Sequence, residues 1–170
     1  AYSRLYERDR AFAEEVVRES LETSRGSIGL PGGGAEDWRW QISKRDPRWP
    51  EVERALMWLR LGLERRGRHK LLELARDEQR PDLQWLSAWI FDTFEMYHWS
   101  HDIPRRQLIE YRNFPIVGSR RQHWELAFPA PFATHVKRAA KREGLEESFI
   151  WGVMREESGY APAVRSRASA

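Results

Sequence analysis

The spacing of apolar side chains along the middle of this chain is that of α-helices. Between residues 47 and 99, apolar residues recur every three or four positions, and no stretch alternates apolar and polar residues as a half-buried strand would. Pro50 stands where a first helix can begin, and its apolar face would be Val52, Leu56, Leu59 and Leu63. The glycine of "ERRGR", Gly67, predicts a turn. A second helix is predicted from there to Pro81, with Leu71, Leu72, Leu74 and Ala75 on its apolar side.

A third helix is predicted over "PDLQWLSAWIFDTFEMYHW", residues 81–99, and its inward side chains would be Leu83, Leu86, Ile90, Phe91 and Phe94. Pro104 can begin a short fourth helix. The segment "NFPIVGSRRQHWELAFPAPF" contains several prolines and predicts a loop and a domain boundary. Two more helices are predicted after it, "ATHVKRAAKREGL", which Gly144 would end, and "EESFIWGVMREES".

The fold class predicted from this pattern is all-α, an irregular TPR-like α-superhelix of helical hairpins. Residues 1–24 would form an N-terminal helix, 25–46 a flexible glycine-rich linker, 47–123 the hairpins, and 124–170 the start of a further domain. The glycines of "LPGGGAED" lack the G-K-[ST] ending of a phosphate loop, so phosphate binding is not expected there.

Composition narrows the classes of function. The chain has 170 residues, no cysteine and nine tryptophans, and its net charge is +3. Basic residues are interleaved with acids, so a nucleic-acid-binding arm is not expected, whereas an anionic polymer such as a bacterial cell wall would suit this surface. No apolar run approaches the roughly twenty residues that span a bilayer. The chain does not begin with Met, and we expect it to be a fragment or a processed product.

Two adjacent glutamates stand at the end of the last predicted helix, where the helix dipole favours cations. At about 100° per residue, Glu157 falls near the centre of the apolar stripe and Glu156 about 90° away from it; the stripe is Phe149, Ile150, Val153 and Met154. Glu157 is therefore expected to point inward, where burial and the dipole would keep its carboxyl protonated, as a general acid requires. In the alternative interpretation, the helix is already frayed and both acids face water.

The closing "FIWGVMREESGYAPAVRSRASA" resembles the start of the catalytic domain of the soluble lytic transglycosylases, the SLT family. The matching positions are Glu157-Ser158, Tyr160, Pro162 and "SRASA" at 166–170, where Ser169 replaces the glycine of Ser-x-Ala-Gly-Ala. "FPAPF" at 128–132 resembles the family's Tyr-Pro-x-Pro-Phe, with Phe128 in place of Tyr. The specific resemblance covers residues 124–170, which would be the start of a lysozyme-like SLT catalytic domain, incomplete in this chain. The preceding hairpins resemble the family only in architecture.

The resemblance implies a peptidoglycan lytic transglycosylase, which cleaves the β-1,4 bond between MurNAc and GlcNAc and leaves a 1,6-anhydro-muramyl end. Glu157 would be the single catalytic acid and base, and Ser158 and Tyr160 would support the site or bind substrate. Glu156 would not be a second carboxylate, because adjacent helical residues point about 100° apart. Ser158 fits equally well as a polar residue near a helix C-terminus.

The resemblance further implies no cofactor, no metal and no nucleic acid. The partner would be peptidoglycan glycan strands, with protein partners bound through the helical repeats, and the location the periplasm or cell envelope of a bacterium. The rest of the family's site would follow Ala170, so the fragment is expected to be inactive alone. The alternative function is a TPR-like helical scaffold that binds proteins or glycans.

Three other features favour structural roles. His98 and His101, near Asp102, have the spacing of a metal pair but lack a third ligand, so capping or surface roles are expected. The helical tryptophans, including Trp85 and Trp89, are expected to pack in the core rather than bind sugar. The arginine-rich "LERRGRHK" predicts a solvated hairpin tip.

Overall fold

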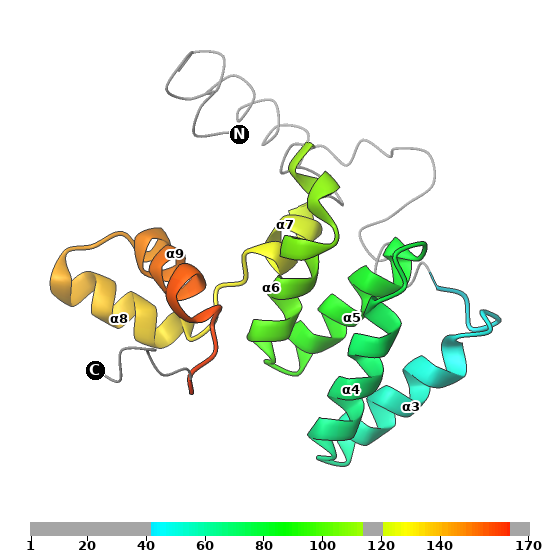
Figure 1. The fold of residues 1–170 in the computed structure, drawn as a ribbon. Helices are drawn as coiled ribbons and strands as arrows, with labels where there is room; N and C mark the ends of the chain where they lie inside the picture. Colours follow the sequence, from blue (N-terminus) through cyan, green and yellow to red (C-terminus); the bar gives the residue numbers. More distant parts are fainter. Residues whose placement is uncertain (1–41, 114–120, 164–170) are drawn as a thin grey trace, which may run out of the picture.

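The computed structural model describes residues 42–113 and 121–163 (Figure 1). All regular structure in these two ranges is helical, seven α-helices and one short 3₁₀ helix, which confirms the all-α prediction. The predicted N-terminal helix, most of the predicted linker and "SRASA" lie outside the described residues. No helix in the described ranges is long and apolar enough to span a bilayer.

The first hairpin consists of α3 (Trp49–Arg60) and α4 (Glu64–Ala75). Pro50 lies in the first turn of α3, as predicted. The predicted turn at Gly67 is wrong: the chain turns at Gly62, whose φ is +72°, and Gly67 is buried inside α4. A Cβ at Gly67 would lie 2.6 Å from the Leu59 side chain, so glycine is needed there for the close packing of α3 against α4. Leu63 is exposed because α3 has already ended.

The second hairpin consists of α5 (Pro81–Thr93) and α6 (Tyr97–Arg106). The single helix predicted over 81–99 is therefore wrong. Glu95 takes a left-handed conformation with φ +57°, and the Met96 amide donates to the Phe91 carbonyl at 2.8 Å, which closes a C-terminal cap on α5. Pro104 lies near the end of α6 rather than at the start of a fourth helix.

The core lies between the helices of these two hairpins. Nearly all the side chains predicted to face inward are buried or half-buried, among them Val52, Leu71, Leu74, Leu83, Ile90 and Phe91. Gln84 is buried with them, and its Nε2 donates to the Ala75 carbonyl at 3.2 Å and to Gln107 at 3.1 Å. The last residues of the predicted flexible linker also pack: Ile42 is buried, and Asp46 accepts a 2.7 Å bond from Arg80.

The segment predicted to be a loop, residues 113–132, contains a helix. The 3₁₀ helix η2 (Ile109–Asn113) precedes residues outside the described ranges, and α7 (Arg121–Ala127) follows them. Edge-to-face and stacked rings join this segment to α5, and they belong to Trp85, Tyr111, Trp124 and Phe128. These rings confirm the packing role predicted for Trp85. The predicted domain boundary between residues 123 and 124 falls inside α7.

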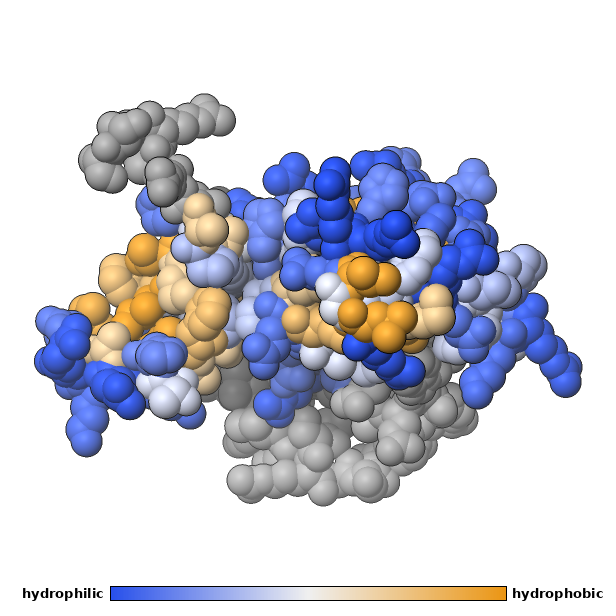
Figure 2. All heavy atoms as spheres, turned by 90° about the horizontal axis from the view of Figure 1, so that it is seen from below, coloured by the Kyte–Doolittle hydropathy of each residue, from blue (hydrophilic) through white to orange (hydrophobic). Residues whose placement is uncertain are grey.

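The last hairpin consists of α8 (Ala133–Glu143) and α9 (Glu147–Ser158), and Gly144 ends α8 with φ +66°, as predicted. Trp151 of α9 donates from Nε1 to the Pro131 carbonyl at 2.9 Å. The hairpin lies beside α6 and α7 (Figure 1) and exposes apolar side chains toward the viewer at the left of Figure 2. The exposed apolar residues of this hairpin and its lead-in are Phe128, Phe132, Leu145, Phe149 and Val153.

Candidate functional site

The C-terminal end of α9 carries the glutamates and is tightly capped. The Gly159 amide donates to the Arg155 carbonyl at 3.1 Å, and the Tyr160 amide donates to the Met154 carbonyl at 3.3 Å. Gly159 and Tyr160 both have left-handed backbones, with φ +55° and +62°. Helix α9 is therefore fully formed at Glu157 and is not frayed there.

Glu157 is exposed, so the prediction that it points inward is wrong. The prediction assumed that the apolar stripe of α9 faces a core. Phe149 is 59% exposed and Val153 45% exposed, and no residue of α9 is buried. Since the stripe itself faces outward, a carboxyl near its centre faces outward as well, and both glutamates face water.

Glu156 is exposed at the flank of the helix, as predicted, and links α9 to α6. Its Oε2 accepts a hydrogen bond from Arg105 Nη2 at 3.1 Å, and its Oε1 lies 3.4 Å from Arg155 Nη1. Its carboxylate pairs with arginines of α6 and α9.

The other two predicted site residues are held by structural contacts. Ser158 donates from Oγ to the Met154 carbonyl at 2.8 Å, the bond expected of a polar residue near a helix C-terminus. Tyr160 is 3% exposed, and its ring meets the His101 ring edge-to-face at 5.1 Å. Burial raises the pKa of the Tyr160 hydroxyl.

One face of α6 holds the end of α9. His98 Nδ1 lies 3.1 Å from the Gly159 carbonyl, so this nitrogen carries the proton and donates. His101 is 1% exposed, and its Nδ1 donates to the His98 carbonyl at 3.1 Å. Its Nε2 has no hydrogen-bond partner among the described residues, and burial lowers the pKa of His101.

Sequence reasoning missed this contact, although a signal was present. His98, His101 and Arg105 are spaced three and four residues apart, which places them on one face of a helix. The spacing that suggested a metal pair serves to cap a neighbouring helix. In the described ranges, no cluster of three or more His, Asp or Glu side chains could hold a metal ion.

The "FPAPF" segment, residues 128–132, also contacts α9 and the start of α6. The Arg155 guanidinium lies 4.2 Å from the centre of the Phe128 ring, a cation–π contact. Phe132 meets the Tyr97 ring at 6.1 Å. The two stretches that carry the family resemblance, 128–132 and 157–160, are therefore both tied to the start of α6.

A concavity of ≈ 460 Å³ adjoins this region. Its lining combines two carboxyls with aromatic walls, and it includes Trp89, Asp92, Tyr97, Glu125 and Phe128. Burial raises the pKa of Asp92, and nearby Glu125 adds to this effect. Glu125 is exposed and paired with Arg121 at 2.8 Å. This group is not apparent in the sequence, because its residues come from three different helices and from the segment that follows α7.

Comparison with known proteins identifies no relative: no protein-family model matches the chain, and neither a curated protein nor a solved structure gives a significant match.

Proposed function

We propose that this chain is part of a peptidoglycan lytic transglycosylase of the bacterial cell envelope, in which Glu157 is the only catalytic acid and base. The observation that carries the proposal is the position of Glu157. Its carboxyl is exposed at the end of a helix, at the place that the SLT-like motif assigns to the acid. A polymeric substrate can reach such a carboxyl, and a glycan laid over it would remove water and favour the protonated form.

The cap on α9 supports a catalytic position for its last turn. A proton donor must be held in a fixed place relative to the bond that breaks. The end of α9 is held by the bond from His98 to Gly159, the ring contact between His101 and Tyr160, and the pair between Arg105 and Glu156. These three contacts surround Glu157 in sequence and leave its side chain open.

The proposed reaction needs one carboxyl. Glu157 donates its proton to the glycosidic oxygen as the bond from C1 breaks, and positive charge develops on C1. The C6 hydroxyl oxygen of the same muramyl residue then bonds to C1, and its proton returns to Glu157. No water is consumed, which is why a second carboxylate is not required.

The apolar surface of the last hairpin agrees with a larger helical domain. Phe149 and Val153 on α9 and Leu145 before it are exposed together. Apolar patches of this kind mark sites where another surface packs. We propose that another surface covers these residues when the glycan groove is complete.

The test is Glu157→Gln in the full-length protein, assayed on purified sacculi by mass spectrometry of the released anhydro-muropeptides. We expect a loss of roughly 100-fold or more, because Gln cannot donate the proton. Glu147→Gln, at the other end of α9, is the matched control and should keep most of the activity. Full activity of Glu157→Gln would refute the proposal, and binding of sacculi without product by the wild type would favour a glycan-binding scaffold instead.

A further inference from the structure

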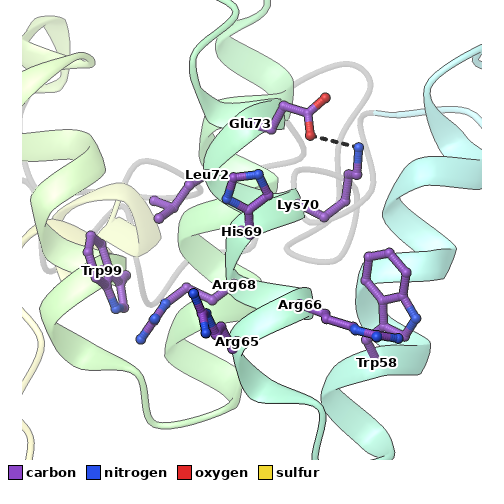
Figure 3. Close-up of a pocket in the computed structure, with 9 residues that line it drawn as sticks. All are labelled: Trp58, Arg65, Arg66, Arg68, His69, Lys70, Leu72, Glu73 and Trp99. Atoms are coloured by element: carbon purple, nitrogen blue, oxygen red, sulfur yellow. Dashed lines mark hydrogen bonds and ion pairs between the residues drawn. The ribbon is translucent and has the colours of Figure 1, made fainter.

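A second and larger concavity lies on the hairpins, at the segment that the sequence predicts to be a solvated tip. Its volume is ≈ 810 Å³, and it is lined by residues of α3, α4 and α6 and by none of α8 or α9. Figure 3 shows Trp58 of α3 at one side, Trp99 of α6 at the other, and the side chains of α4 between them. The site is thus built from three helices rather than from one exposed turn.

Four of the lining residues are cations, and they differ in how far they are neutralised. Lys70 is committed to acids, 2.7 Å from Glu73 and 3.5 Å from Glu51. By contrast, Arg65 and Arg66 are exposed and make no ion pair or side-chain hydrogen bond with any described residue. Two guanidinium groups with all their donors available therefore border the concavity.

The third arginine, Arg68, lies over an aromatic ring. The Arg68 guanidinium lies 5.6 Å from the centre of the Trp99 ring and 3.9 Å from Glu64. Trp58 and Trp99 are both half-buried, so each is anchored in the helices and exposes part of its indole. Indole faces bind sugar and other rings by stacking, whereas guanidinium groups bind carboxylate or phosphate oxygens with paired hydrogen bonds.

We propose that this concavity binds a small ligand in which an oxyanion, carboxylate or phosphate, is attached to a sugar ring. The oxyanion would be bound by the guanidinium of Arg65 or of Arg66, which lie on different sides of α4 (Figure 3), and the ring would lie against the indole on that side. The volume is that of a pocket for one small molecule or a short segment of a chain. This site does not depend on Glu157 and would bind its ligand whether or not the chain has transglycosylase activity.

The surface favours a short acidic sugar over nucleic acid. Binding to a nucleic-acid backbone needs a continuous stripe of cations. Here Glu51, Glu64 and Glu73 lie among the cations and pair with two of them. The cations of this concavity that have no acidic partner among the described residues, Arg65 and Arg66, lie in the first turn of α4. A positive charge confined to one turn suits a single oxyanion.

The experiment uses the full chain in about 50 mM salt and five probes: N-acetylmuramic acid, glucose 6-phosphate, neutral N-acetylglucosamine, inorganic phosphate and, as a competitor, a single-stranded oligonucleotide. Affinities are measured by NMR titration, in which the indole N–H signals of Trp58 and Trp99 report ring contact. We expect at least one acidic sugar to bind, to shift an indole signal, and to bind about 10-fold more tightly than the neutral sugar. The two acidic sugars distinguish carboxylate from phosphate recognition.

The paired variant Arg65→Ala/Arg66→Ala should weaken binding of the acidic sugar by about 10-fold or more. Arg65→Lys/Arg66→Lys, which keeps the charge and helix-forming character but loses the paired donors, should give a smaller loss. The control is Lys137→Ala/Arg138→Ala, which removes the same charge from exposed positions on α8 and should bind normally.

Three outcomes would overturn the proposal: unchanged affinity in both Arg65/Arg66 variants, equal binding of the neutral sugar, or failure of both acidic sugars to bind. Inorganic phosphate binding as tightly as the sugar phosphate would overturn the role of the ring. A single-stranded oligonucleotide that displaces the sugar with a higher affinity would overturn the assignment of ligand class.

Discussion

His98 Nδ1 donates a hydrogen bond to the carbonyl oxygen of Gly159, 3.1 Å away, and thereby joins the first turn of α6 to the end of α9. The bond spans 61 positions of sequence and satisfies a carbonyl at the end of a helix, where carbonyls lack partners within the helix. It also fixes the turn that follows Glu157 and Ser158. The proposed catalytic helix is thus positioned by the helical hairpins.

Gly159→Ala should lower the free energy of unfolding more than Gly144→Ala. Both glycines have positive φ, and an alanine costs roughly 1–2 kcal/mol of backbone strain at either position. At Gly159, the new Cβ would also lie 3.1 Å from His98 Nδ1, whereas at Gly144 it meets nothing within 4 Å. We expect urea denaturation to show a further loss of about 1 kcal/mol for Gly159→Ala. Equal losses would mean that the contact with His98 is loose.

Stability should fall as pH drops through the range in which the unfolded chain protonates His101. Burial lowers the pKa of His101, so the unfolded state takes up a proton near pH 6.5 while the folded state does not. The unfolded state is therefore favoured progressively below that pH. His101→Gln should flatten the pH dependence of the free energy of unfolding between about pH 7 and pH 5, measured by denaturant titration at each pH.

His135→Gln is the control for this experiment, because the His135 side chain is exposed on α8. Its stability is measured at the same pH values, so that the loss of an exposed histidine is compared with the loss of a buried one. A slope that is the same in His101→Gln and in the wild type would contradict the assignment.

Asp92→Asn should stabilise the protein at neutral pH. Burial raises the pKa of Asp92 above the value in the unfolded chain, so the folded state is penalised once the unfolded carboxyl ionises. This penalty is absent below about pH 3.9, grows as pH rises to the folded pKa, and is constant above it. The gain of Asp92→Asn in free energy of unfolding should thus be present at pH 7 and absent at pH 3. Asp102→Asn, which breaks the 2.6 Å pair with Arg106, should give no such gain.

Gly67→Ala should destabilise the first hairpin, although alanine is the better helix former. The added Cβ would lie 2.6 Å from two Leu59 side-chain atoms and 3.0 Å from the Ala55 carbonyl oxygen, so α3 and α4 would have to separate. We expect a loss of about 1–3 kcal/mol in the free energy of unfolding.

Gly152→Ala provides the opposite case. Gly152 lies inside α9, and a Cβ there meets nothing within 4 Å. Helix propensity alone then applies, and the variant should gain about 0.5–1 kcal/mol. The two variants can be compared in one denaturation series, in which a stabilised Gly67→Ala would show that the hairpin is not closely packed.

Local patterns in the sequence determined most of the helices. Apolar spacing identified α3, α4, α8 and α9, and it also identified buried residues such as Leu71 and Phe91. The reason is that the angular position of a side chain around a helix follows from its place in the sequence alone. Gly144 was recognised as a helix end for a similar reason, since glycine is the residue that takes a left-handed conformation without strain.

Tertiary structure decided the features that depend on what lies opposite each helix. Gly67 was mistaken for a turn because its reason for being glycine, the approach of Leu59, is 8 residues away and on another helix. The break between α5 and α6 falls at Glu95, a residue type that does not mark a helix end. The exposure of Glu157 could not be predicted, because an apolar stripe shows that a helix face should be covered but not whether anything in this stretch of chain covers it. In this protein the last turn of α9 and its cap contact Arg105 and His98 of α6, and these contacts join elements far apart in the sequence.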